Sequence, residues 1–175
     1  MRSSTRRLRY LTLFAMLGAI IHASQFAMQA VPGVQLMGLF IAAFTLTYRV
    51  RALIPIYVWI ILHGAFYGFI WMMPYLYVWL FPWGLFMLAG KIKLPKKVLA
   101  PIYMVLCALG GLSFGTLYAP FWALWTGLSF NGMVAWIAAG FPVDIGYAIS
   151  NFAFGTLIIP LSELLKKLDR QSGRM

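Results

Sequence analysis

Long apolar stretches make up most of the chain, and short polar or basic breaks separate them. Such stretches predict helices, because only helices and closed barrels satisfy their backbone hydrogen bonds in lipid. The sequence has no ten-residue alternation of apolar and polar residues, which would be typical of a membrane β-barrel. We therefore expect six membrane-spanning helices, over about residues 9–29, 33–48, 52–70, 75–90, 98–118 and 142–165.

The segment 119–140 does not fit this series. It is rich in tryptophan and carries no charge, so it is apolar enough to lie in the membrane interface or to fold back over the outer face. Counting it as a further span would move the C-terminal basic cluster to the other side of the membrane, and the charge pattern argues against that. We expect a long outer loop between the fifth and sixth helices.

Composition and charge support an integral membrane protein with one membrane domain over residues 1–175. Hydrophobic residues form 63% of the chain, and the mean hydropathy is +0.87, whereas soluble domains have about 45–50% apolar residues. The net charge of +11 comes from four basic clusters, at residues 2–9, 49–51, 91–97 and 166–174. The positive-inside rule places all four in the cytoplasm. Both termini are then cytoplasmic, the location is the cell membrane, and the charge does not indicate nucleic-acid binding.

One polar face is predicted near the start of the last span. Asp144 is the only acidic residue outside the C-terminal tail. If a helix begins near Pro142, then Asp144, Tyr147 and Asn151 lie on one face at i, i+3 and i+7. Two interpretations are open. Asp144 caps the helix at the membrane interface, where the helix dipole favours an acid, or the face looks into a cavity, since polar groups seldom face lipid.

Aromatic and polar residues of the other spans add further candidates. Tyr75, Trp79 and Trp83 recur at i, i+4 and i+8, either as an interfacial belt or as a surface for stacking on a ring. His63 lies near mid-span and is either a packed polar residue or part of a cavity floor. The complete set of expected substrate-binding residues is Gln35, His63, Tyr67, Tyr75, Trp79, Trp83, Asn131, Asp144, Tyr147 and Asn151.

The first span contains Ala15 and Ala19, which are four residues apart and make a flat strip that another helix can approach closely. The partner is either a neighbouring span or another protein. Elsewhere the chain offers little chemistry. It has no phosphate-binding loop of the Walker type, and its two histidines lack a partner at metal-ligand spacing. We expect no catalysis, no metal and no cofactor.

Together these features resemble the substrate-binding S components of energy-coupling factor (ECF) vitamin transporters. The resemblance is carried by the Ala15/Ala19 pair, the six-helix topology, the long outer segment, and a last helix with Pro142, Asp144, Tyr147 and Asn151. It implies binding of a vitamin or related micronutrient near the outer face. It also implies a complex with a transmembrane coupling (T) subunit, docked on Ala15 and Ala19, and two cytoplasmic ATPase subunits. In relatives we expect His at the position of Tyr147. The alternative is an autonomous small-molecule carrier or channel.

The ligand is expected to be a neutral or cationic heteroaromatic molecule. A buried carboxylate needs a paired charge or several hydrogen-bond donors, and every Lys and Arg is assigned to the cytoplasmic side. Asp144 on the outer side would repel an anion and attract a cation. Thiamine-like, pyridoxine-like, flavin-like or deazapurine-like rings therefore fit this pattern better than biotin, folate or pantothenate.

Overall fold

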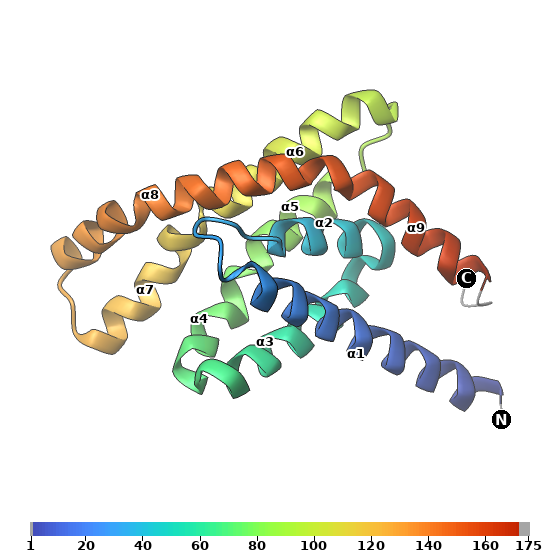
Figure 1. Cartoon of the computed structure of the whole chain (residues 1–175), viewed down its shortest axis with the longest axis horizontal. Coiled ribbons are helices and arrows are strands. Elements are labelled where there is room, and N and C mark those ends of the chain that lie inside the picture. The colour runs from blue at the N-terminus through green and yellow to red at the C-terminus, as the bar shows by residue number, and fades with distance from the viewer. Residues whose placement is uncertain (1, 172–175) are drawn as a thin grey trace.

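The computed structural model describes residues 2–171 of the chain, with side chains from Leu8 onward. In this part of the chain every regular element is helical, so the all-α prediction is confirmed (Figure 1). In chain order the elements are α1 (Arg2–Met28), α2 (Met37–Tyr48), the 3₁₀ turn η1 (Arg49–Ala52), α3 (Leu53–Tyr67), α4 (Phe69–Val78), α5 (Leu80–Ala89), α6 (Lys96–Leu112), α7 (Phe114–Thr126), α8 (Phe130–Phe154), the 3₁₀ turn η2 (Gly155–Leu157) and α9 (Ile158–Gln171).

Five continuous helical stretches are long and apolar enough to cross a membrane. A span of the hydrocarbon layer needs about 20 apolar residues. Large apolar side chains are exposed on the outside, for example Phe66, Leu124 and Phe130 at 68%, 85% and 74%, which suits contact with lipid. These helices indicate a multi-pass membrane protein. The stretches are Leu8–Met28, Met37–Tyr67, Phe69–Ala89, Lys96–Thr126 and Phe130–Gln171.

The stretch Met37–Tyr67 is divided at Arg49, where the sequence places a basic break. Arg49 has a φ of 56°, which is uncommon for a residue other than glycine. The chain then passes through η1 and changes direction into α3 (Figure 1). With 12 residues, α2 is only about 18 Å long.

The long outer loop expected at 119–140 is replaced by a helical hairpin. Helix α7 continues to Thr126, a turn of 127–129 follows, and α8 begins at Phe130 (Figure 1). Gly127 ends α7 in the left-handed conformation, with a φ of 70°. The side chain of Ser129 accepts a hydrogen bond from the Gly132 N–H at 3.2 Å and caps α8. The predicted helix start near Pro142 is therefore wrong, and Asp144 cannot cap a first turn.

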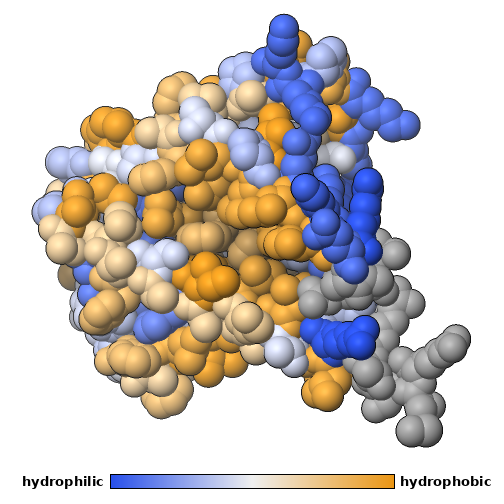
Figure 2. All heavy atoms as spheres, turned by 45° about the vertical axis from the view of Figure 1, so that its right-hand side comes forward, coloured by the Kyte–Doolittle hydropathy of each residue, from blue (hydrophilic) through white to orange (hydrophobic). Residues whose placement is uncertain are grey.

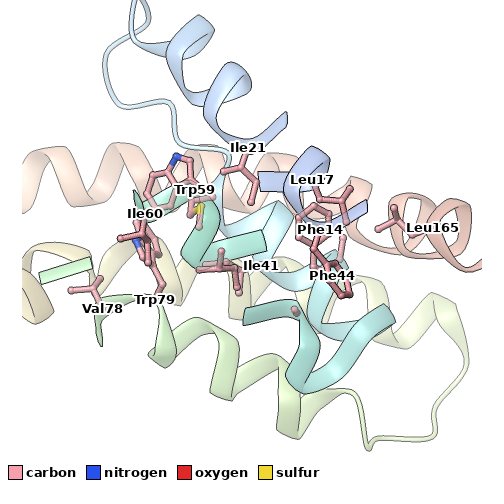
Figure 3. Packing of buried hydrophobic residues seen from close by; sticks show 14 residues of the cluster. Phe14, Leu17, Ile21, Ile41, Phe44, Trp59, Ile60, Val78, Trp79 and Leu165 are labelled. Atoms are coloured by element: carbon pink, nitrogen blue, oxygen red, sulfur yellow. The ribbon is translucent and has the colours of Figure 1, made fainter. Parts of the chain in front are cut away.

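Buried apolar side chains join α1 to α3 and α4 (Figure 3). Phe14, Leu17 and Ile21 of α1 face this core. Gly18 brings α1 close to α3, since a Cβ atom there would lie 2.5 Å from Cγ1 of Val58. The packing of α1 inside the protein therefore uses Gly18. A smaller cluster beneath α6 and α9 includes Phe86, Tyr103, Cys107 and Ile158.

The basic residues meet at one end of the molecule. The Arg51 guanidinium lies 5.6 Å from the centre of the Tyr10 ring, Arg49 Nη2 donates to the Met87 carbonyl at 2.9 Å, and Lys96 pairs with Glu163. These contacts connect η1 to α1 and α5, and α6 to α9. Figure 2 shows the hydrophilic residues gathered along one side, next to an apolar surface. Arg174 and the side chains of Arg2, Arg6 and Arg7 lie outside the described residues.

Candidate functional site

A cavity of about 270 Å³ opens at the end of α1 and α3 that is farthest from the basic residues. Its walls come from the C-terminal part of α1, the loop that joins α1 to α2, the second half of α3, and α4 with the residue that joins it to α5, and one residue comes from α8. Its lining residues are His22, Gln25, Phe26, Met28, Gln29, Val31, Pro32, Gly33, Val34, Gln35, Trp59, His63, Tyr67, Tyr75, Trp79 and Tyr147.

The loop between α1 and α2 forms one wall because it is fixed to α8. Gly33 has a φ of 75°, and a Cβ atom there would lie 3.4 Å from Cα of Gly146, so the two backbones come close together. The Gln35 N–H donates to Ser150 Oγ at 3.1 Å, and the Gln35 side-chain oxygen accepts from Asn151 Nδ2 at 3.4 Å. Glycine is needed at 33 because its positive φ strains other residues.

Aromatic rings form the floor and another wall of the cavity. Trp59 stacks on Tyr75 with ring centres 5.5 Å apart and meets Trp79 edge-on at 5.6 Å. The His63 ring lies 5.0 Å from Tyr75 and 4.5 Å from Tyr67. Figure 3 shows Trp59 and Trp79 next to each other, at the end of the core cluster away from Leu165. These rings offer apolar faces with polar edges, as ring-binding sites require.

Three buried polar atoms on the cavity walls lack a hydrogen-bonding partner among the described residues. They are Nδ1 of His22 and the indole nitrogens of Trp59 and Trp79. Trp59 and Trp79 are only 2% and 4% exposed. A buried polar group without a partner costs about 1–3 kcal/mol, and native proteins leave few of them. A guest in the cavity does not reach these three atoms, because each has less than 1 Å² of exposed surface.

The structure brings part of the expected site together. The candidates that line the cavity are Gln35, His63, Tyr67, Tyr75, Trp79 and Tyr147. Trp83 does not line the cavity. It lies one turn beyond Trp79 toward the basic end, where its indole N–H donates to the Arg49 carbonyl at 3.5 Å. Asn131 is exposed in the first turn of α8, at the tip of the α7–α8 hairpin.

Asp144 and Asn151 are buried between α8 and its neighbours and do not line the cavity. Both carboxylate oxygens of Asp144 accept from the Gly115 N–H at 3.1 Å. Asn151 donates to Gln35, and its oxygen lies 3.7 Å from the Cys107 sulfur. The residues Gln35, Cys107, Gly115, Asp144, Ser150 and Asn151 are called the polar seam below. Because Asp144 is occupied in this seam, it does not offer the cavity the charge that the sequence pattern suggested.

Sequence reasoning did not select His22, Gln25, Gln29 and Trp59, although all four line the cavity. A signal for them exists. His22, Gln25 and Gln29 are spaced at i, i+3 and i+7 on α1, and Gln29 Nε2 donates to the Tyr67 hydroxyl. Trp59 precedes His63 and Tyr67 at four-residue spacing, the same pattern that singled out Tyr75 and Trp79.

The cavity is lined by aromatic, amide and apolar side chains and by two histidines. Its lining includes no Lys, Arg, Asp or Glu. Among residues 2–171, no three His, Cys, Asp or Glu side chains are grouped to hold a metal ion. The chain matches no protein-family model, and neither a curated protein nor a solved structure matches it.

Proposed function

We propose that the chain is the substrate-binding S component of an ECF-type importer. It binds a vitamin or related micronutrient in the cavity at the outer face and delivers it with energy from ATP hydrolysed by partner subunits. The observation that carries the proposal is the position of the cavity. It lies at the opposite end of α1 and α3 from Arg9, Arg49 and Arg51, and basic residues mark the cytoplasmic side of membrane proteins.

The proposed topology has six spans with both termini in the cytoplasm. They are α1, α2, α3, α4–α5, α6–α7 and α8–α9, with α2 as a short second span. The support is that contacts of Arg49, Arg51 and Lys96 at the basic end join η1 to α1 and α5, and α6 to α9. An even number of spans follows from two termini on the same side.

The exposure of Ala15 and Ala19 supports docking of a transmembrane coupling subunit on α1. Both alanines are exposed, whereas Gly18 faces α3. The neighbouring side chains of Met16 and Ile20 are 59% and 47% exposed. The small-residue strip is therefore not used for packing within the chain, and a partner helix can approach it closely.

The double substitution Ala15→Trp and Ala19→Trp tests this function. The indoles should hold a partner helix away, so co-purification with the coupling and ATPase subunits and ATP-dependent uptake should both be lost. Retention of the co-purifying small molecule, measured by mass spectrometry, should stay near the wild-type level because Ala15 and Ala19 are exposed and do not line the cavity. Ala65→Trp, on an exposed alanine of α3, is the matched control. Uptake by the chain alone in liposomes would instead identify an autonomous carrier.

The topology has a separate test by cysteine labelling in a Cys107→Ser background. A cysteine at Lys93 should react with a membrane-impermeant reagent only after the cells are opened. A cysteine at Val31, which is 49% exposed in the loop over the cavity, should react in intact cells. Labelling of the Lys93 position from outside would refute the six-span arrangement.

A further inference from the structure

Building on this proposed binding function, we infer that the amide N–H groups of Gln25 and Gln35 recognise hydrogen-bond acceptors of the ligand, such as a ring carbonyl. Gln25 lies on α1 and Gln35 in the loop that joins α1 to α2, and both line the cavity. In each glutamine the side-chain oxygen is bonded to the protein, and the nitrogen remains for a guest. The selectivity is thus set by which end of each amide faces the cavity.

The orientation of the Gln25 amide is fixed by the backbone just before α2. Its oxygen accepts a hydrogen bond from the Leu36 N–H at 3.4 Å. A backbone N–H can only donate, so the nitrogen of this amide cannot take the place of the oxygen. The nitrogen carries two N–H donors, and it has no partner among the described residues.

The orientation of the Gln35 amide is fixed from behind by the polar seam. Its oxygen accepts from Asn151 Nδ2 at 3.4 Å, and Asn151 is completely buried. The oxygen of Asn151 lies 3.7 Å from the Cys107 sulfur, whose S–H is a donor, so the nitrogen of Asn151 is the end that faces Gln35. The backbone N–H of Gln35 donates to Ser150 Oγ at 3.1 Å, which holds the residue in place.

Both amide nitrogens can be reached from the cavity. The indole nitrogens of Trp59 and Trp79 have less than 1 Å² of exposed surface, whereas the unpartnered amide nitrogens of Gln25 and Gln35 are not sealed in this way. The rest of the Gln35 side chain is enclosed, since the residue is only 8% exposed. The two amides are held at neighbouring points of the chain, because the oxygen of Gln25 is bonded to the residue that follows Gln35. A guest that turns an acceptor toward this wall therefore meets N–H donors.

A third glutamine of the same cavity has the opposite arrangement. Gln29 Nε2 donates to the Tyr67 hydroxyl, so its amide nitrogen already has a partner and the free end of its amide is the oxygen. The cavity therefore offers donors at Gln25 and Gln35 and an acceptor at Gln29. A guest with a donor at the Gln25 and Gln35 wall would set N–H against N–H, and both groups would lose the hydrogen bonds that they make in water.

Two pairs of uncharged, shape-matched compounds test the inference on the purified full-length protein in detergent. In 1-methyl-4-pyridone and 4-methylaniline, a methyl group lies opposite a carbonyl acceptor or an amino donor. The second pair, 1-methyl-4-quinolone and 4-methyl-1-naphthylamine, repeats the contrast on two fused rings. A cavity of about 270 Å³ accommodates either frame, because about 150 Å³ holds benzene. Calorimetry at millimolar concentration compares each variant with wild type for each compound, so differences in hydrophobicity between the compounds cancel.

Methionine substitutions remove the donors and keep the length of the side chain. Gln25→Met and Gln35→Met should each weaken binding of at least one carbonyl compound about 2- to 12-fold, the range expected for one hydrogen bond. Binding of the matching amino compound should not weaken. Gln29→Met is the matched control, because it removes a cavity glutamine whose amide nitrogen is already bonded to Tyr67, and it should not weaken binding of the carbonyl compound.

A measurement on the wild-type protein keeps the test independent of how the variants fold. Glutamine labelled with ¹⁵N gives side-chain N–H signals for Gln25, Gln29, Gln35 and Gln171. The carbonyl compound should shift the signals of Gln25 and Gln35. The signal of Gln171 should stay in place, because this residue lies at the end of α9 and does not line the cavity. If a substitution unfolds the protein, these shifts decide the question.

Four results would overturn the inference. They are unchanged binding of the carbonyl compound by both variants, an equal loss of the carbonyl and the amino compound, Gln25 and Gln35 signals that do not respond to a bound carbonyl compound, and no binding by either carbonyl compound. The proposed function fails on different observations, namely ATP-independent uptake or no association with ATPase subunits. Failure of one is thus distinguishable from failure of the other.

Discussion

The polar seam and the cavity share Gln35, yet the hydrogen bonds of the two regions differ. In the seam, Asp144 is bound to Gly115 and Asn151 to Gln35. On the cavity wall, the nitrogens of Trp59 and Trp79 have no partner among the described residues. A polar residue within a membrane helix therefore points to a ligand only where the protein itself does not use its hydrogen bonds.

Glycine explains how the two regions come to differ. Gly111 and Gly115 let α6 and α7 approach α8, and a Cβ atom on Gly111 would lie 2.8 Å from the carbonyl oxygen of Tyr147. At this close approach, the Asp144 side chain of α8 reaches the backbone N–H of Gly115 in α7. Around the cavity, the large rings of Trp59 and Tyr75 stack on each other instead, and they border a space of about 270 Å³.

The largest effect is expected for Gly111→Ala. The added methyl group would collide with the α8 backbone at Tyr147, and such overpacking costs about 1–3 kcal/mol of unfolding free energy. Thermal unfolding in mild detergent measures the change. Gly140→Ala is the control, because nothing lies within 4 Å of a Cβ atom there and alanine is better than glycine in a helix by up to about 1 kcal/mol. Equal effects at the two positions would mean that α6 and α8 are not in close contact.

Asp144 gives a smaller effect that separates stability from binding. Asp144→Asn keeps one oxygen to accept from Gly115, so we expect a loss of about 1 kcal/mol in stability. Affinity for the ligand should not change, because Asp144 does not line the cavity. Asp144→Ala leaves the Gly115 N–H without this acceptor and should cost more, about 1–3 kcal/mol. A clear loss of affinity at unchanged stability in the Asn variant would move Asp144 into the binding site.

Tyr147→Phe is the mildest change and tests the cavity side of the same helix. Tyr147 lines the cavity one turn from Asp144, and removing its hydroxyl should weaken binding by no more than about 12-fold while stability stays nearly constant. Tyr103→Phe serves as the control, since Tyr103 packs on Phe86 in the core cluster beneath α6. Calorimetry with the same ligand compares the two variants.

Much of the helical pattern was predictable because it depends on local sequence. Apolar runs predict the helices, and the basic residues near Arg49 mark a break that the structure shows. The error at α8 has a local cause as well. Pro142 was taken as a start signal, but Ser129 already caps the helix, and proline is tolerated inside membrane helices, where neighbouring groups satisfy the freed backbone.

The division between seam and cavity was not predictable in the same way. Spacing predicts that Asp144, Tyr147 and Asn151 share one face of α8. It does not say which of them are hydrogen-bonded to other residues of the protein and which of them lines the cavity. The Asn151 partner Gln35 is 116 residues away in the sequence, and the position of Gly115 opposite Asp144 depends on how α7 crosses α8. Hydrogen bonds of this kind follow from tertiary packing, which the helix periodicity of a single sequence does not encode.

The long helical stretch Phe130–Gln171, which runs through α8, the 3₁₀ turn η2 and α9, has a further consequence. Its 42 residues extend over about 63 Å, roughly twice the thickness of a bilayer's hydrocarbon layer. It cannot stand upright within that layer, so it must tilt steeply or carry its first turns beyond it. Those turns include Phe130 and Val134, which are 74% and 48% exposed, and water is a poor environment for them. Hydrophobic mismatch then makes the inclination of this helix depend on bilayer thickness, and with it the position of Tyr147 at the cavity.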